Sequence, residues 1–229
     1  MAESETEVPI RDAATVIIVR RDRGMPEILM GQRGAKAVFM PSKFVFPGGA
    51  LDDGDHAPDV GTALAPLCTE RLAVDAPAAL ARPLARAAIR EVWEETGLAL
   101  GAPDPDAGSY ISAAPQGWKG FLAQGLIPRL DALTFVFRAV TPPGRPRRFD
   151  ARFFVADAAA ITGDPDDFSG AEEELSHLQW IGLNQARSLE LPFITEVVLA
   201  EVEASLDETE PRQVPFFQHD DERAYFRLL

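Results

Sequence analysis

The amino-acid sequence predicts one α/β domain built around a mixed sheet, and three observations support this fold class. Short β-branched or aromatic runs alternate irregularly with segments whose apolar residues recur at helical spacing. Hydrophobic residues make up 46% of the 229 residues, which is enough for a packed core without disulfides. No internal repeat and no clear linker divides the chain, so we expect residues 1–229 to form a single domain.

The expected strands are apolar, β-branched or aromatic runs that end at turn residues. They are residues 13–20, 27–31, 44–46, 132–140, 152–156 and 178–181, with two short strands expected within 214–229. The turn residues Asp22, Arg23 and Gly24 separate the first two strands, and this spacing predicts a hairpin.

Three segments are expected to be helices, namely residues 61–75, 84–96 and 193–206. The apolar positions of the first are Leu64, Leu67, Leu72 and Val74. The second is preceded by Pro83 and followed by Gly97, the residue type most common just after a helix. Residues 101–117 are expected to be a loop and residues 1–12 a frayed tail.

Charge and composition narrow the classes of partner. Acidic residues outnumber basic ones by 36 to 22, for a net charge of −14, and such a surface repels a nucleic-acid backbone. A small anionic substrate is still compatible, because a bound divalent cation inverts the local field. No run approaches the roughly 20 apolar residues of a membrane span, and the acidic start lacks the apolar region of a signal peptide. With one cysteine, Cys68, the chain forms no internal disulfide, and we expect a cytoplasmic protein.

The most informative stretch places three carboxylates on one predicted helix. Glu91, Glu94 and Glu95 have the spacing i, i+3 and i+4, so one face presents all three. A solvated acidic face is one interpretation of this pattern. A binding site for a hard divalent cation is the other, since Mg²⁺ prefers oxygen ligands and shares them with substrate phosphates.

The residues around these glutamates resemble the Nudix box, written G-x5-E-x7-R-E-U-x-E-E-x-G-U with U apolar. The second half matches at Arg90, Glu91, Val92, Glu94, Glu95, Gly97 and Leu98. The first half is similar to Phe46, Pro47, Gly48 and Gly49, with Gly49 as the opening glycine and Asp55 in place of the first glutamate. On these motifs the chain resembles the Nudix hydrolase family.

The box is interrupted in this sequence. Gly49 and Arg90 lie 41 positions apart where an uninterrupted box has 14, an excess of 27 residues. Lengthening a flexible loop costs only about 0.6 kcal/mol per doubling, so an insertion is compatible with the fold. We expect residues 56–82 to form an ordered helical insertion that covers part of the cleft. Whether Asp55 reaches the site stays open, and counting back from Arg90 puts Arg82, which cannot bind a metal, at the glutamate position.

The resemblance implies an α/β/α sandwich with a mixed sheet and hydrolysis of a nucleoside diphosphate linked to a second group. It implies that Glu91, Glu94 and Glu95, with the Gly49 carbonyl, hold Mg²⁺ or Mn²⁺. Arg90 would pair with one of the glutamates and fix its rotamer. The general base often lies in a late loop of these enzymes, which points to residues 172–174 and to Glu174 among them. A homodimer is also compatible with the family.

A narrower resemblance is to the split-box subgroup that includes the peroxisomal coenzyme A diphosphatases and bacterial relatives. Arg33, Phe46, Gly48 and Gly49 fit its motif, and we expect them to contact substrate, whereas Val38 and Ser42 depart from it. Arg145, Arg147 and Arg148 form a basic cluster, and Arg147 and Arg148 are expected to bind an extra phosphate such as the 3′-phosphate of coenzyme A. A solvated loop is the alternative for this cluster.

Two other functions stay open. One is a pyrophosphatase for NAD(H), ADP-ribose or nucleotide sugars. The other is a non-catalytic Nudix module that senses a nucleotide. The intact set of Glu91, Glu94 and Glu95 favours an enzyme, because a pure binder has no need of all three.

Overall fold

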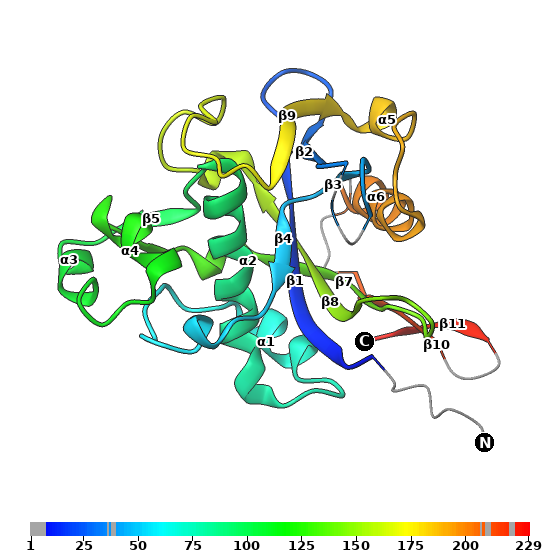
Figure 1. Cartoon of the computed structure of the whole chain (residues 1–229), viewed down its shortest axis with the longest axis horizontal. Helices are drawn as coiled ribbons and strands as arrows, with labels where there is room; N and C mark the ends of the chain where they lie inside the picture. Colours follow the sequence, from blue (N-terminus) through cyan, green and yellow to red (C-terminus); the bar gives the residue numbers. More distant parts are fainter. Residues whose placement is uncertain (1–7, 36, 38–39, 207, 209–211, 220–222) are drawn as a thin grey trace.

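A mixed sheet runs through the centre of the computed structural model, which describes residues 8–35, 37, 40–206, 208, 212–219 and 223–229 (Figure 1). Its strands are β1 (Ile10–Arg20), β2 (Glu27–Arg33), β3 (Phe44–Val45), β4 (Gly48–Ala50), β7 (Thr134–Val140), β8 (Arg148–Asp157), β9 (Leu175–Gly182), β10 (Pro215–His219) and β11 (Ala224–Leu228). The order is β11-β10-β7-β8-β1-β2-β3, with β4 paired to β1 and β9 paired to β2. Strands β1 and β8 are parallel, as are β7 and β10, and the other pairs are antiparallel. The expected mixed sheet is therefore confirmed.

Helices cover both faces of this sheet (Figure 1). They are α1 (Pro66–Leu72), α2 (Ala81–Thr96), α3 (Ala107–Tyr110), α4 (Gln116–Ala123), α5 (Leu183–Ala186) and α6 (Phe193–Ser205). Short 3-10 turns occur at Asp53–Asp55, Ala78–Leu80, Leu130–Ala132 and Ala158–Ala160, and β5 (Gly101–Pro103) pairs with β6 (Leu126–Pro128) in a separate two-stranded sheet. None of the helices in the described part of the chain has the length and apolarity that a membrane span requires.

Side-chain alternation in β1 explains the sandwich. Val16 and Ile18 pack in the core beneath α2, whereas Ile17 and Val19 pack in the core beneath α6. Successive side chains of a strand point to opposite faces, so an unbroken apolar run buries both sides of the sheet. The same run thereby fixes α2 on one face and α6 on the other.

Helix α2 begins and ends where its sequence requires. It begins at Ala81, so Pro83 lies in its first turn rather than before it, where the missing N–H costs nothing. It ends at Gly97, whose φ of +74° lies in the left-handed region and whose N–H donates to the Trp93 carbonyl. A side chain there would lie 2.9 Å from the Gly170 backbone, which makes glycine necessary at this position.

The expectation of a loop over residues 101–117 was wrong. Strand β5 and helix α3 lie within this range, and helix α4 begins near its end. Helix α4 contains two glycines, so its own sequence favours a helix weakly. It forms because it buries Trp118, Phe121 and Leu122, and such packing outweighs local propensity.

The segment 56–82 contains α1, which is shorter than the predicted 61–75 helix. The helix begins at Pro66. The residues before it are not helical, and the N–H of Thr62 donates to the Pro128 carbonyl instead. Leu64 and Leu72 are buried as expected, together with Cys68, whereas Leu67 and Val74 are partly exposed. The buried residues join the core that contains α2, so this segment is packed against the sandwich.

We expect the thiol of Cys68 to be unreactive in the native protein. Burial raises the pKa of this thiol to about 11, so little thiolate exists at about pH 8. A colorimetric thiol reagent should label Cys68 in urea but not in the native chain. Rapid native labelling would show that the segment around α1 opens readily, contrary to its packing.

Candidate active site

Two of the three glutamates of α2, Glu91 and Glu95, lie against the short strand β4. Glu95 is only 3% exposed, and the N–H of Gly48 donates to its Oε2 at 2.8 Å. The carboxylate of Glu91 lies against Gly49, where an added Cβ would come within 2.6 Å of its oxygens. Gly48 and Gly49 pair with Thr15 and Ala14 of β1, so the sheet holds both glycines in place. The glycines thus allow β4 to approach the carboxylates as no other residues could.

Arg90 connects these carboxylates to the turn that precedes the α1 segment. Its Nη1 donates to Glu91 at 2.9 Å and to Glu94 at 2.8 Å. Its Nε and Nη2 donate to the two oxygens of Asp55, each at 2.9 Å, and Nη2 also reaches the Ala50 carbonyl. Arg90 therefore orients two glutamates rather than the one that was expected.

The open question about Asp55 is answered by its position. The side chain is fully buried, and the indole Nε1 of Trp118 donates to its Oδ1 at 3.4 Å, beside the paired Arg90. A capping interaction with Asp52 orders the turn that carries it. Asp55 thus reaches α2 through Arg90, while Arg82 donates to Asp59 at the surface.

Burial raises the pKa of all three glutamates. For Glu91 it does so to about 7, against the opposing effect of Arg90 and with help from Glu94 and Glu174. For Glu95 burial and the nearby Glu91 hold the pKa well above its ordinary value, although the Gly48 N–H acts the other way. For Glu94 the direction is the same, and burial is again the main cause. These carboxylates are short of positive charge, which a divalent cation supplies.

The donor set fits a hard divalent cation. Among the described residues, no group of three or more His, Cys, Asp or Glu side chains is already arranged to bind a metal ion. Glu91 and Glu94 instead form ion pairs with Arg90. Mg²⁺ needs no such cage, since it keeps several waters and uses one or two carboxylates together with substrate phosphates. Oxygen donors with raised pKa values beside the glycine backbone of β4 meet that requirement.

A cavity of about 920 Å³ adjoins Glu91. Glu91 and Gly49 line it, together with Arg33 and Glu174, whose side chains form an ion pair at 2.8 Å. Its walls come from β1, β4, β8, the start of α6 and the loop between β7 and β8. Phe46, Phe153, Phe193 and Phe217 make much of this wall apolar.

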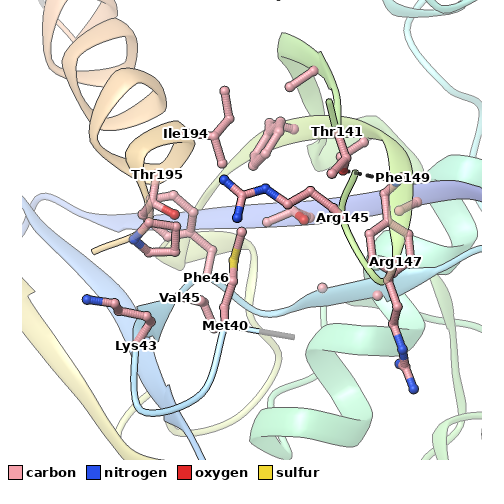
Figure 2. Close-up of a pocket in the computed structure, with 18 of the residues that line it drawn as sticks. Met40, Lys43, Val45, Phe46, Thr141, Arg145, Arg147, Phe149, Ile194 and Thr195 are labelled. Carbon is pink, nitrogen blue, oxygen red and sulfur yellow. Dashed lines mark hydrogen bonds between the residues drawn. The ribbon is translucent and has the colours of Figure 1, made fainter. Parts of the chain in front are cut away.

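The three arginines of the β7–β8 loop point in different directions. Figure 2 shows the guanidinium of Arg145 extending across the cavity toward Ile194 and Thr195, whereas that of Arg147, which also lines the cavity, points in a different direction. Arg148 is buried as the first residue of β8, does not line the cavity, and donates to the Thr141 carbonyl. Of the three clustered arginines, Arg145 and Arg147 therefore line the cavity and Arg148 does not.

Several residues that border the site were not expected from the sequence. Gly117 and Trp118 come from α4; Gly117 falls at the end of the expected 101–117 loop, and Trp118 follows it in a stretch for which no element was expected. His219 and Phe217 reach the cavity from β10, which pairs with β7 near the β7–β8 loop. The one sequence signal for Phe217 and His219 was the apolar run that predicted a strand near the C-terminus.

Comparisons with known proteins place this geometry in a known fold. No family model matches the sequence. A Nudix hydrolase structure from Alicyclobacillus acidocaldarius is 27% identical, with a TM-score of 0.64 over 88% of this chain and 97% of that one. The chain has the Nudix fold. The Nudix domain of Shewanella oneidensis NrtR, solved with ADP-ribose, shares the fold at 10% identity and a TM-score of 0.51, covering 90% of this chain and 94% of that one.

One curated relative adds a likeness in sequence. A Caenorhabditis elegans protein named "Putative nudix hydrolase 7" is 26% identical over 178 residues, which is 75% of this chain. The chain spans about half the length of that relative, 51%. Together with the shared Nudix fold, this likeness supports the Nudix hydrolase family.

Proposed function

We propose that this chain is a metal-dependent Nudix diphosphohydrolase that cleaves the diphosphate bond of a nucleoside diphosphate linked to another group. The observation that carries the proposal is the arrangement of α2. Arg90, fixed by Asp55, orients Glu91 and Glu94, and Glu91 lines a large cavity. Ionising buried carboxylates whose pKa values are raised costs free energy, and a bound catalytic cation would offset this cost.

Each residue has a proposed role in this reaction. Glu91, Glu94 and Glu95, with the Gly49 carbonyl, would hold Mg²⁺ or Mn²⁺, which neutralises the diphosphate and lowers the pKa of an attacking water. Arg90 orients two of these ligands. Phe46 and Gly48 would form the wall that the substrate contacts.

Glu174 is the proposed general base. It lines the cavity, and its charge raises the pKa of both Glu91 and Glu95, so it lies close to the ligand set. Arg33 holds its carboxylate at 2.8 Å. A base on a loop that is fixed by an arginine can accept a proton from water without leaving the site.

The test of this function is a product assay with and without a divalent cation. Purified protein, first treated with a chelator, should release two phosphate-ester products from a panel of nucleoside diphosphate compounds only after Mg²⁺ or Mn²⁺ is restored. A panel with coenzyme A, NAD(H), ADP-ribose and nucleotide sugars identifies the substrate by product mass. Binding without products across the panel would instead support a nucleotide-sensing module.

Within this activity we propose coenzyme A or its thioesters as substrate. The cavity pairs an apolar wall with a cationic side chain, Arg145, that extends across it (Figure 2). An apolar acyl or pantetheine arm suits the wall, and a 3′-phosphate suits the arginine. Arg33 and the split box point to the same substrate class.

Coenzyme A should therefore be cleaved better than its 3′-dephospho form. One charge-assisted hydrogen bond contributes about 1.5–3 kcal/mol, so kcat/KM should differ roughly tenfold or more. Arg145→Ala should remove most of this preference and spare the dephospho substrate, whereas Arg147→Ala should remove less. Arg187→Ala, at an exposed ion pair with Glu203, is the matched control and should change neither rate. Equal wild-type rates on both forms would leave hydrolysis intact and discard coenzyme A.

A further inference from the structure

Helix α4 packs directly against the catalytic helix α2. The ring of Phe121 contacts Trp93 of α2 edge-on at 5.8 Å, and Trp118 contacts Phe121 at 5.5 Å. Trp118 also donates to Asp55 and lies under the guanidinium of Arg86, another α2 residue. These contacts fix α4 in position, because moving it would expose two buried aromatic rings.

Gly117, the second residue of α4, lies at the closest point of this contact. A Cβ at this position would overlap Oε1 of Glu94 and lie 3.1 Å from Cδ of Arg90. The other oxygen of Glu94, Oε2, accepts a hydrogen bond from Arg90 at 2.8 Å. The Glu94 carboxylate is therefore held between Arg90 on one side and the bare backbone of residue 117 on the other.

We propose that Gly117 is a positioning residue that sets the orientation of the Glu94 carboxylate. The inference rests on the proposed role of Glu94 as a metal ligand. A side chain at 117 must displace α4, Arg90 or Glu94. Helix α4 is anchored by Trp118, and Arg90 is held by the buried Asp55. Glu94, whose side chain is 24% exposed and has one hydrogen bond to Arg90, is the group that yields.

The same helix supplies a matched control. Gly120, one turn later, faces Trp93, and an added Cβ would have its nearest neighbour at 3.6 Å, an ordinary contact. Gly120→Ala and Gly117→Ala make the same chemical change on the same helix, and both raise helix propensity. They differ in one respect: only the methyl group of Gly117→Ala would contact a proposed metal ligand, Glu94.

The experiment measures Mn²⁺ affinity from the electron paramagnetic resonance signal of free Mn²⁺, together with thermal unfolding of the metal-free protein and turnover. Gly117→Ala should weaken Mn²⁺ binding about 10- to 100-fold, the usual cost of disturbing a group that orients a ligand. Gly120→Ala should bind Mn²⁺ within about twofold of the wild type, because it touches no ligand.

A double-mutant cycle with Glu94→Ala tests whether the effect passes through Glu94. The shortened side chain removes the overlap with Oε1 of Glu94, which leaves the 3.1 Å contact with Cδ of Arg90 as the closest one. In that background Gly117→Ala should weaken Mn²⁺ binding no further and should raise the unfolding temperature, as expected for alanine in a helix. If the single variant Gly117→Ala does not fold, the comparison in the Glu94→Ala background still tests the proposal.

The outcomes separate the two proposals. Equal Mn²⁺ affinity of Gly117→Ala and Gly120→Ala would overturn the role of Gly117, and so would a fall in unfolding temperature in the Glu94→Ala background. A wild-type protein that binds no Mn²⁺ and releases no product would instead overturn the proposed function. The unfolding temperatures of the cycle would still report the steric link between residues 117 and 94.

Discussion

Glu94→Gln and Glu95→Gln are each expected to lower turnover by roughly a hundredfold or more. A catalytic cation contributes several kcal/mol to the reaction, and about 1.4 kcal/mol corresponds to a factor of ten in rate. The amide keeps the shape of the carboxylate but removes the charge that attracts the cation.

The fold should survive both substitutions. Glu95 is buried and its pKa is well above the ordinary range, so the neutral amide resembles the form that the metal-free protein prefers. The amide oxygen can still accept from the Gly48 N–H. Metal-free Glu95→Gln should therefore unfold at the wild-type temperature or above, measured by circular dichroism. Glu70→Gln, an exposed change on α1, is the activity control, and near-normal turnover in both α2 variants would refute their role as ligands.

Asp55→Ala is expected to destabilise the protein by about 3–5 kcal/mol. The change removes the bidentate partner of Arg90 and leaves a buried guanidinium with less compensation, and breaking a buried pair from one side has this cost. In a domain of this size each kcal/mol shifts the unfolding temperature by about 2–4 °C. A fall of roughly 6–20 °C should therefore be visible by calorimetry or denaturant titration.

Asp59→Ala provides the comparison for this prediction. Asp59 also pairs with an arginine of α2, Arg82, but its side chain is 69% exposed. Exposed pairs contribute about 0–1 kcal/mol, so the unfolding temperature should change little. Similar falls in unfolding temperature for Asp55→Ala and Asp59→Ala would mean that the buried ion pair contributes no more to stability than the exposed one.

The elements that could be predicted from sequence are those whose pattern is local. The apolar run of β1 and the periodicity of α2 each specify an element without knowledge of the rest of the chain. Gly97 marked the end of α2 because a left-handed residue is needed there. The spacing of Glu91, Glu94 and Glu95 indicated the candidate site because this pattern, too, lies within one short segment.

The features that could not be predicted depend on contacts between distant segments. Asp55 and Arg90 are 35 positions apart, and the inserted residues conceal their pairing. Helix α4 forms through the burial of Trp118, Phe121 and Leu122, whose i, i+3, i+4 spacing covers too few residues to specify a helix without the rest of the fold. The direction of Arg148 follows from β8 beginning at that residue, a boundary that is invisible in a run of arginines and prolines.

The pairing of Asp55 with Arg90 also bears on how the chain tolerates change. The ion pair joins the residue just before the inserted segment to α2, the helix that follows it, so the residues between them form a loop closed at its base. Added residues in the exposed turns of that loop would leave the base unaltered, and each doubling of a flexible length would cost only about 0.6 kcal/mol. The exposed turns inside the box are thus suitable points for inserting a tag or a reporter domain while the glutamates keep their arrangement.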